Sequence, residues 1–356
     1  MSTVLFAGGG TLGPVTPLLA VIDRLREKDS TLTFAWAGTD HGPERELIQK
    51  KGIPFVSIPT AKLPRFFTPK LATLPFDLLR ARKAASLTLD VFKPRLVMSA
   101  GGFTAVPIVF EAGMRGISCM THQLDAKPLL SNRLIANMCR YVTTSFPYDR
   151  APFGSKVVTY QVPTPVRSAF HELPSREAAC RHFGLSPDRP VIFVTGGGTG
   201  SLHLNEAMSA IAHMLPPNVQ VIHATGKGKT VGFLTERSGY IVTEFLSDDM
   251  TTAVAAADII VSRAGFGAMS EFAAASKAVI FVPLPNSPQE VNVTSIGDAA
   301  IAIHEHQHGW HRLLFDAIED LLHRPEERER LGRALHECIP TDDGEVIANL
   351  AMSVMV

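Results

Sequence analysis

The sequence predicts an α/β protein that consists of two doubly wound domains with a ligand cleft between them. Short β-branched runs alternate with amphipathic stretches, which is the pattern of parallel strands connected by helices. The chain has 356 residues, more than one typical domain contains. Each half also begins with an apolar strand that ends in a glycine cluster, at residues 8–11 and 196–199, so the halves share a weak internal symmetry.

The first half shows regularly spaced strands and a clear first helix. We predict strands at residues 4–7, 32–37, 55–58, 96–99, 118–121 and 157–162. Pro17 suits the first turn of a helix. The apolar positions around it recur at helical spacing and predict one buried face, formed by Leu18, Leu19, Val21, Ile22 and Leu25.

A proline-rich passage at residues 162–167 interrupts this alternation and predicts an interdomain linker. Further strands are expected at residues 191–195, 219–224, 241–242, 259–262 and 279–282. We therefore divide the chain into a first domain (1–163), a second domain (164–340) and a terminal segment (341–356). Helical spacing of apolar residues in that segment predicts a helix that packs back on the first domain.

Composition excludes several classes of protein. Lys+Arg and Asp+Glu number 34 each, so no global field favours nucleic acid as a partner. The four cysteines have no CxxC spacing, which favours a reduced cytoplasmic protein over a disulfide or metal framework. Neither a signal peptide nor a run of about 18 apolar residues is present, so any membrane contact is expected to be peripheral.

The first glycine-rich loop, at residues 8–17, follows a strand and opens a helix. Glycines let a backbone approach a ligand, and a helix N-terminus favours an anion. No Gly-Lys-Ser/Thr follows, so this is not a Walker loop. Gly8, Gly10 and Gly13 fit the dinucleotide-binding pattern G-x-G-x-x-G. That pattern also includes an acidic residue about twenty residues further on, which binds the ribose. The region there offers only Lys28 and Asp29 before the next strand, which disfavours a dinucleotide site.

Similar loops stand at residues 99–107 and 195–201, each after a predicted strand. Residues 258–271 add a strand, a glycine-containing turn and a helix in which Glu271 lies one turn from the start. Its carboxylate is suited to accept hydrogen bonds from ribose hydroxyls, while the turn suits a phosphate. Any one of these loops is more often a structural turn, and Glu271 alone is equally a solvated surface residue. Four such loops, spread over both halves, favour a substrate cleft between the domains.

Seven motifs are spread over nearly the whole chain. They are GGTLGPVTP at 9–17, GGFTAVP at 101–107, HQLD at 122–125 with NR at 132–133, PTPVR at 163–167, GGGTG at 196–200, SRAGFGAMSE at 262–271 and QEVN at 289–292. In this order they resemble the motifs of the MurG family. These enzymes are UDP-N-acetylglucosamine:undecaprenyl-diphospho-muramoylpentapeptide N-acetylglucosaminyltransferases.

The resemblance implies a GT-B glycosyltransferase with two Rossmann-like domains. It would transfer N-acetylglucosamine from UDP-N-acetylglucosamine, with inversion, to the 4-hydroxyl of lipid-linked N-acetylmuramoyl pentapeptide in peptidoglycan synthesis. The first domain would bind the acceptor and the membrane, and the second the UDP-sugar. No DxD-like acidic pair stands where a divalent ion is expected, so we predict metal-independent chemistry without a cofactor.

The resemblance also implies site residues. Glu271 would hold the ribose hydroxyls, the backbone of Leu246 the uracil, and Gln289 the sugar hydroxyls. The complete donor set is Arg167, Gly197, Gly198, Thr199, Gly200, Leu246, Gly265, Ala268, Glu271, Gln289 and Asn292, of which Arg167, Thr199 and the amides of 196–200 would bind the diphosphate. The acceptor set is Gly10, Thr11, Gly13, Gly101, Gly102, Phe103 and Asn132.

Several positions depart from the family pattern. Pro14 replaces a histidine of the first loop, and proline has neither a titratable side chain nor a backbone donor. A general base must then come from elsewhere, and His122 and Asp125 are the candidates. A hydrogen-bonded structural histidine is an equal alternative for His122. Further changes are Gln123, Leu124, Gly198 and Ala268. We expect activity to be retained because Glu271, Arg167, Gln289 and the glycines persist together.

Residues 62–83 interleave basic with apolar side chains, which suits contact with an anionic membrane. We expect Arg65, Phe66, Phe67 and Lys70 to make that contact, and Leu74, Leu78 and Leu79 to face the core. The expected location is the cytoplasm, bound to the inner face of the plasma membrane.

Three other functions stay open. The acceptor-side changes allow transfer to a different lipid, such as a diacylglycerol. A non-catalytic UDP-sugar-binding protein would have kept the nucleotide pocket and lost the base. A nicotinamide-dependent oxidoreductase has the least support, because its only signal is the glycine pattern of the first loop.

Overall fold

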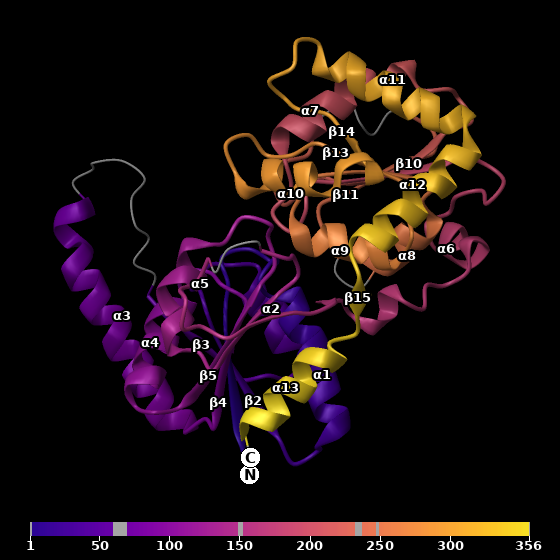
Figure 1. The fold of residues 1–356 in the computed structure, drawn as a ribbon. Helices are drawn as coiled ribbons and strands as arrows, with labels where there is room; N and C mark the ends of the chain where they lie inside the picture. Colours follow the sequence, from indigo (N-terminus) through magenta and orange to yellow (C-terminus); the bar gives the residue numbers. More distant parts are fainter. Residues whose placement is uncertain (1, 60–69, 149–151, 232–236, 247–248, 356) are drawn as a thin grey trace. The chain divides into compact units, whose positions relative to one another are not determined.

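The computed structural model describes residues 2–59, 70–148, 152–231, 237–246 and 249–355. The chain forms two compact units (Figure 1). Unit 1 contains Met1–Pro165 and Asp342–Val356, and unit 2 contains Val166–Thr341. The boundary falls within the proline-rich passage at 162–167. Among the helices of the described ranges, none is both long and apolar enough to cross a bilayer.

Unit 1 is built on a seven-stranded parallel sheet with the order β3-β2-β1-β4-β5-β6-β7. Its strands are β1 (Thr3–Ala7), β2 (Thr33–Gly38), β3 (Phe55–Ser57), β4 (Leu96–Ser99), β5 (Ser118–Gln123), β6 (Tyr141–Thr144) and β7 (Thr159–Gln161). Its helices are α1 (Thr16–Lys28), α2 (Glu44–Lys50), α3 (Lys70–Phe92), α4 (Ala105–Met114), α5 (Leu130–Ile135) and α13 (Glu345–Met355). The sequence analysis missed β6, which is short and carries two threonines.

Unit 2 has a six-stranded parallel sheet with the order β11-β10-β9-β12-β13-β14. Its strands are β9 (Val191–Thr195), β10 (Gln220–Ala224), β11 (Tyr240–Thr243), β12 (Ile259–Ser262), β13 (Val279–Phe281) and β14 (Ile301–Ala302). Its helices are α6 (Arg176–His182), α7 (Leu202–Ile211), α8 (Met250–Ala256), α9 (Phe266–Ala274), α10 (Pro288–Ile296), α11 (Trp310–His323) and α12 (Pro325–Cys338). The two-residue β14 was not predicted.

The two sheets share one topology. In each, the first strand lies between two strands whose connections run in opposite directions, β2 and β4 around β1, and β10 and β12 around β9. Ligands of open α/β sheets bind at the carboxyl ends of the strands at this switch point. Two glycine-rich loops reach that position in unit 1, after β1 and β4. In unit 2 the corresponding loops follow β9 and β12.

Apolar side chains on both faces of each sheet form the cores, as expected for parallel strands covered by helices. Helix α1 buries Leu18, Leu19, Val21, Ile22 and Leu25, which is the predicted face. The terminal helix α13 belongs to unit 1, where it contacts α1 and buries Ile347, Ala348 and Ala351. An ion pair between Lys28 Nζ and Glu345 Oε1, 2.5 Å apart, connects the two helices.

Candidate functional site

The glycine loop between β9 and α7 requires glycine for steric reasons. Gly200 has a φ of +68°, and a Cβ there would lie 2.2 Å from the carbonyl oxygen of Thr225. A Cβ on Gly196 would lie 2.2 Å from the backbone nitrogen of Ser201. The approach at Gly200 packs the loop against the turn after β10, and the approach at Gly196 is to the loop's own backbone. Ser201 then caps α7, because its hydroxyl accepts a hydrogen bond from the Leu204 N–H at 3.3 Å.

A pocket of about 310 Å³ opens above this loop. It is lined by Gly196, Thr199, Gly200, Ser201, Leu202, His203, Lys229, Arg263, Leu284 and Gln289. Two cations and the N-terminus of the ten-residue α7 meet there. A helix N-terminus attracts negative charge, so the pocket suits an anionic ligand such as a diphosphate.

Both cations are held in place by the protein. Lys229 Nζ donates to the carbonyl oxygens of Thr199 at 2.9 Å and Gly200 at 3.1 Å. Arg263 is buried and donates from Nη2 to the Ser201 hydroxyl at 2.6 Å. Its Nη2 also lies 2.5 Å from Glu305 Oε1. Such fixed donors lose little freedom when a ligand binds, which favours affinity.

The sequence analysis did not select Lys229, Arg263 or His203 as pocket residues. Arg263 offered a signal, because it directly follows a strand at the switch point of the sheet. Lys229 comes soon after a strand, behind Gly226 and Gly228. His203 has no distinctive pattern around it, and its place in the pocket follows from the position of α7.

Glu271 lies on α9 and is 6% exposed. Arg167 donates to Glu271 Oε1 from Nη2 at 2.9 Å and from Nε at 3.3 Å. Burial raises the pKa of Glu271 above its usual value, although the charge and hydrogen bonds of Arg167 oppose that shift. Arg167 was expected to bind the diphosphate, but its guanidinium is engaged with Glu271 and does not line the pocket.

The other expected donor residues occupy three kinds of position. Thr199, Gly200 and Gln289 line the pocket, and Gly197 and Gly198 belong to the same loop. Gly265 precedes α9, Ala268 lies on it, and Leu246 follows β11. Asn292 is fully buried and donates from Nδ2 to the Ala264 carbonyl oxygen at 3.2 Å. The side chain of Asn292 therefore holds the turn after β12 and does not face a ligand.

In unit 1, the expected acceptor glycines come together at the switch point. Gly101 and Gly102 have φ values of +96° and +92°, and a Cβ on Gly102 would lie 3.3 Å from the Gly9 carbonyl oxygen. The loops after β1 and β4 are therefore neighbours. Thr11 is exposed there and Phe103 is half-buried.

Asn132 was also expected to bind the acceptor, but it is fully buried. Its Nδ2 donates to the His122 carbonyl oxygen at 3.1 Å and to Gln123 Oε1 at 2.8 Å. It positions the end of β5 and has no surface left for a ligand.

His122 has an environment that does not suit a general base. It is 2% exposed, and its Nδ1 and Nε2 are hydrogen-bonded to the hydroxyls of Thr143 at 2.9 Å and Ser145 at 3.3 Å. Burial lowers its pKa from 6.5 to about 3, against the opposing effect of Thr143. Asp125 is half-buried, and its carbonyl oxygen accepts hydrogen bonds from Gln123 and Tyr148. Of the two candidates, only Asp125 has a solvent-accessible surface of any size.

Glu44 was not predicted as a site residue, yet its carboxylate lies directly against the first glycine-rich loop. It is fully buried, and its Oε1 accepts a hydrogen bond from the Thr39 N–H at 2.7 Å. A Cβ on Gly9 would clash with this carboxylate, at 2.1 Å from Oε1. Its Oε2 is buried without a hydrogen-bond partner among the described residues. No sequence pattern marks Glu44, because it lies on a short helix outside every motif.

The predicted membrane residues Arg65, Phe66 and Phe67 lie outside the described residues. Lys70 begins α3, without a described side chain, and the side chain of Leu74 is likewise outside the description. Leu78 and Leu79 were expected to face the core, and this expectation is wrong. They are 51% and 64% exposed. Figure 1 shows the start of α3 extending away from the rest of unit 1.

Comparisons with known proteins agree with this architecture. Residues 4–144 match the glycosyltransferase family 28 N-terminal domain, and residues 191–337 match the C-terminal domain of that family. The UDP-N-acetylglucosamine–N-acetylmuramyl-(pentapeptide) pyrophosphoryl-undecaprenol N-acetylglucosamine transferase of Nocardioides sp. is 34% identical over 368 residues, which cover 99% of this chain and 98% of that relative. The protein of the same name from Clostridium kluyveri is 35% identical, with coverage of 80% and 79%.

Solved structures show the same fold. The crystal structure of MurG from Acinetobacter baumannii has a TM-score of 0.73 at 22% identity and covers 99% of this chain and 100% of its own. A UDP-GlcNAc 2-epimerase from Neisseria meningitidis bound to UDP-GlcNAc has a TM-score of 0.66 at 14% identity, with coverage of 99% and 98%.

These observations define a glycosyltransferase with the GT-B fold, built from two Rossmann-like domains. Within that class, the chain belongs to glycosyltransferase family 28 and to its MurG family, as the identity to relatives over nearly its whole length shows.

Proposed function

We propose that this enzyme transfers N-acetylglucosamine from UDP-N-acetylglucosamine to the 4-hydroxyl of N-acetylmuramoyl pentapeptide carried on undecaprenyl diphosphate. The observation that carries the proposal is the cationic pocket of unit 2, where Arg263, Lys229 and the N-terminus of α7 surround the loop at 196–200. The names of the relatives at 34% and 35% identity supply the substrates.

On the donor side, the amides of the glycine loop and the two cations bind the diphosphate, and Gln289 binds hydroxyls of the sugar. Glu271 accepts hydrogen bonds from the ribose, with Arg167 holding its carboxylate in place. UDP is the leaving group, and its developing negative charge is stabilised by donors that are already oriented.

On the acceptor side, we assign the loops after β1 and β4 to the acceptor, and Asp125 to proton removal. The 4-hydroxyl oxygen attacks the anomeric carbon as the bond from that carbon to UDP breaks, which inverts the configuration. The proton of the hydroxyl passes to the Asp125 carboxylate. His122, with its low pKa, positions the end of β5 and does not act as the base.

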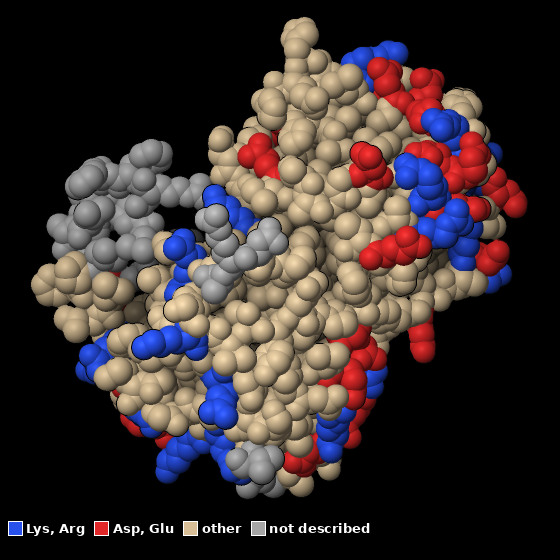
Figure 2. All heavy atoms as spheres, viewed as in Figure 1, with Lys and Arg blue, Asp and Glu red and all other residues tan. Residues whose placement is uncertain are grey.

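Membrane association is a further part of the proposal. The exposed face of α3 carries Phe76, Leu79, Leu87 and Val91 at helical spacing, with Arg80 and Lys83 on the same face. Figure 2 shows uncharged surface interleaved with Lys and Arg where α3 runs. A face of this composition suits peripheral contact with an anionic bilayer, which a lipid-linked acceptor requires.

The experiment is a UDP-release assay on the purified full chain. UDP-N-acetylglucosamine, UDP-glucose and UDP-galactose are compared, each with and without a short-chain analogue of the lipid-linked muramoyl pentapeptide. We expect release that requires both UDP-N-acetylglucosamine and the analogue. Saturable UDP binding without turnover would instead favour a second candidate function, transfer to another lipid acceptor. Pro14 supports this candidate, because it replaces a family histidine in the acceptor loop.

A further inference from the structure

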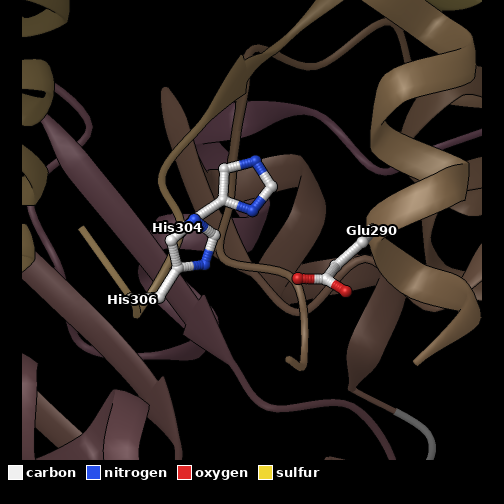
Figure 3. A group of neighbouring side chains, drawn as sticks. All are labelled: Glu290, His304 and His306. Atoms are coloured by element: carbon white, nitrogen blue, oxygen red, sulfur yellow. The ribbon is translucent and has the colours of Figure 1, made fainter. Parts of the chain in front are cut away.

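Three side chains beside the donor pocket are arranged as the ligands of a metal ion. Glu290, His304 and His306 each offer one ligand atom, and these atoms all lie within 4.8 Å of one another. Figure 3 shows the carboxylate of Glu290 extending from its helix toward the two imidazole rings. We propose that Glu290, His304 and His306 bind a divalent transition-metal ion of the zinc class.

The chemical types of the three ligand atoms determine which class of metal the site would bind. Two imidazole nitrogens and one carboxylate oxygen are typical of zinc sites that keep a further position for water. Magnesium and calcium prefer sites built almost entirely from oxygen ligands. A tetrahedral ion with bonds of about 2.1 Å separates its ligands by about 3.4 Å. The observed ligand atoms lie within 4.8 Å of one another, and small rotations of the exposed His306 and the half-buried Glu290 would bring them to the shorter distance that an ion requires.

His304 provides a second, independent observation. Its Nδ1 is buried and has no hydrogen-bond partner among the described residues. A buried ring nitrogen without a partner is costly. A cation bound at Nδ1 would provide that partner.

The surrounding backbone holds the ligands in position. The His304 N–H donates to Gln307 Oε1 at 2.7 Å, and the Gln307 N–H donates to the His304 carbonyl oxygen at 3.0 Å. This turn keeps the rings of His304 and His306 together, with centroids 5.2 Å apart. The Asn286 N–H donates to Glu290 Oε2 at 3.0 Å, which orients the carboxylate and leaves Oε1 for an ion.

The site would connect two parts of the donor-pocket wall. Gln289, which lines the pocket, directly precedes Glu290 on α10. Glu305 stands between the two histidines, contacts Arg263 at 2.5 Å and accepts a hydrogen bond from His203 at 3.0 Å. An ion would therefore fasten the start of α10 to the segment that supports Arg263. We assign the ion no step of the transfer reaction, so the prediction of metal-independent transfer is unaffected.

The test is zinc binding by the full chain after treatment with a chelator. Zinc chloride is titrated in competition with a chromophoric chelator, and we expect one ion per chain. His306→Ala and Glu290→Gln should each weaken binding by at least about tenfold. His308→Ala is the matched control, because His308 is exposed in the same histidine-rich stretch but lies outside the cluster. Its affinity should equal that of the wild type.

Two further measurements identify the ligands. Zinc should raise the Tm of the wild type and of His308→Ala, but not that of His306→Ala. Cobalt(II) should give a tetrahedral d–d spectrum without a thiolate charge-transfer band, which excludes the exposed Cys338 as a ligand. No binding at micromolar zinc, equal binding by His306→Ala, or an equal loss in His308→Ala would each overturn the proposal.

Discussion

Arg167 and Glu271, 104 residues apart in the chain, form an ion pair in which Arg167 Nη2 lies 2.9 Å from Glu271 Oε1. The pair connects the segment before α6 to helix α9. Glu271 is almost fully buried, and a buried carboxylate stays ionised only when a partner compensates the loss of water. Arg167 supplies that partner and leaves its own guanidinium stacked over Phe170, 4.8 Å from the ring centroid.

We expect Glu271→Gln to raise the KM for UDP-N-acetylglucosamine by about tenfold or more, because hydrogen bonds to a charged group contribute about 1.5–3 kcal/mol. Arg167→Gln should have a similar effect through Glu271, and the double variant should lose little more than either single variant. Steady-state kinetics measures all three. Glu206→Gln, on the exposed side of α7, is the control. Additive losses in the double variant would show that the two residues act independently.

Gly200→Ala should destabilise unit 2 and abolish donor binding. The new Cβ would meet the Thr225 carbonyl oxygen at 2.2 Å, in a backbone conformation that alanine rarely adopts. We expect a loss of about 2 kcal/mol or more in the free energy of unfolding, measured with urea. Gly265→Ala serves as the control, because its Cβ would enter open space and its φ is negative. Equal stabilities would contradict the steric argument.

The buried His122 should make stability depend on pH. Its pKa is about 3 in the folded protein and near 6.5 once unfolded, so the unfolded chain takes up the proton first as the pH falls. Stability is therefore lost progressively below pH 6.5. The wild type loses free energy of unfolding between pH 7 and pH 5, and His122→Gln should reduce this loss by about 2 kcal/mol. Urea unfolding at both pH values measures the difference.

The control for this pH experiment is His213→Gln, which changes an exposed histidine. It should lose as much stability between the two pH values as the wild type. An unchanged pH dependence in His122→Gln would mean that His122 is protonated, or solvated, in the folded protein.

Phe76→Ser combined with Leu79→Ser should weaken binding to vesicles that contain phosphatidylglycerol by at least about tenfold, because each apolar side chain contributes roughly 1.5–3 kcal/mol when it is fully buried. These residues are 70% and 64% exposed, so the folded chain should tolerate the change. Cosedimentation measures the binding. Leu313→Ser, a partly exposed leucine on α11, is the control. Undiminished binding by the double variant would remove α3 as the contact surface.

Much of the fold was predictable because its signals are local. Strands β4 and β12 occupy the predicted residues 96–99 and 259–262, since continuous apolar runs between turn residues mark buried parallel strands. Strands β6 and β14 were missed, because Tyr141–Thr144 is partly polar and Ile301–Ala302 is too short to show a pattern. Both form because a neighbouring strand edge is available to pair with them, a condition that a local window does not contain.

The sequence by itself determined the order of the motifs and the glycine loops at the strand ends, because residue type and spacing carry that information. The class of enzyme came from the resemblance of those motifs to the MurG family. Only the tertiary structure decided that Arg167 pairs with Glu271, that Arg263 and Lys229 line one pocket of unit 2, and that Glu290 meets two histidines. It also made His122 a buried residue with a low pKa instead of an accessible base. Contacts and burial of this kind depend on which distant segments the sheet brings together, and burial in turn determines which side chains can hold a charge.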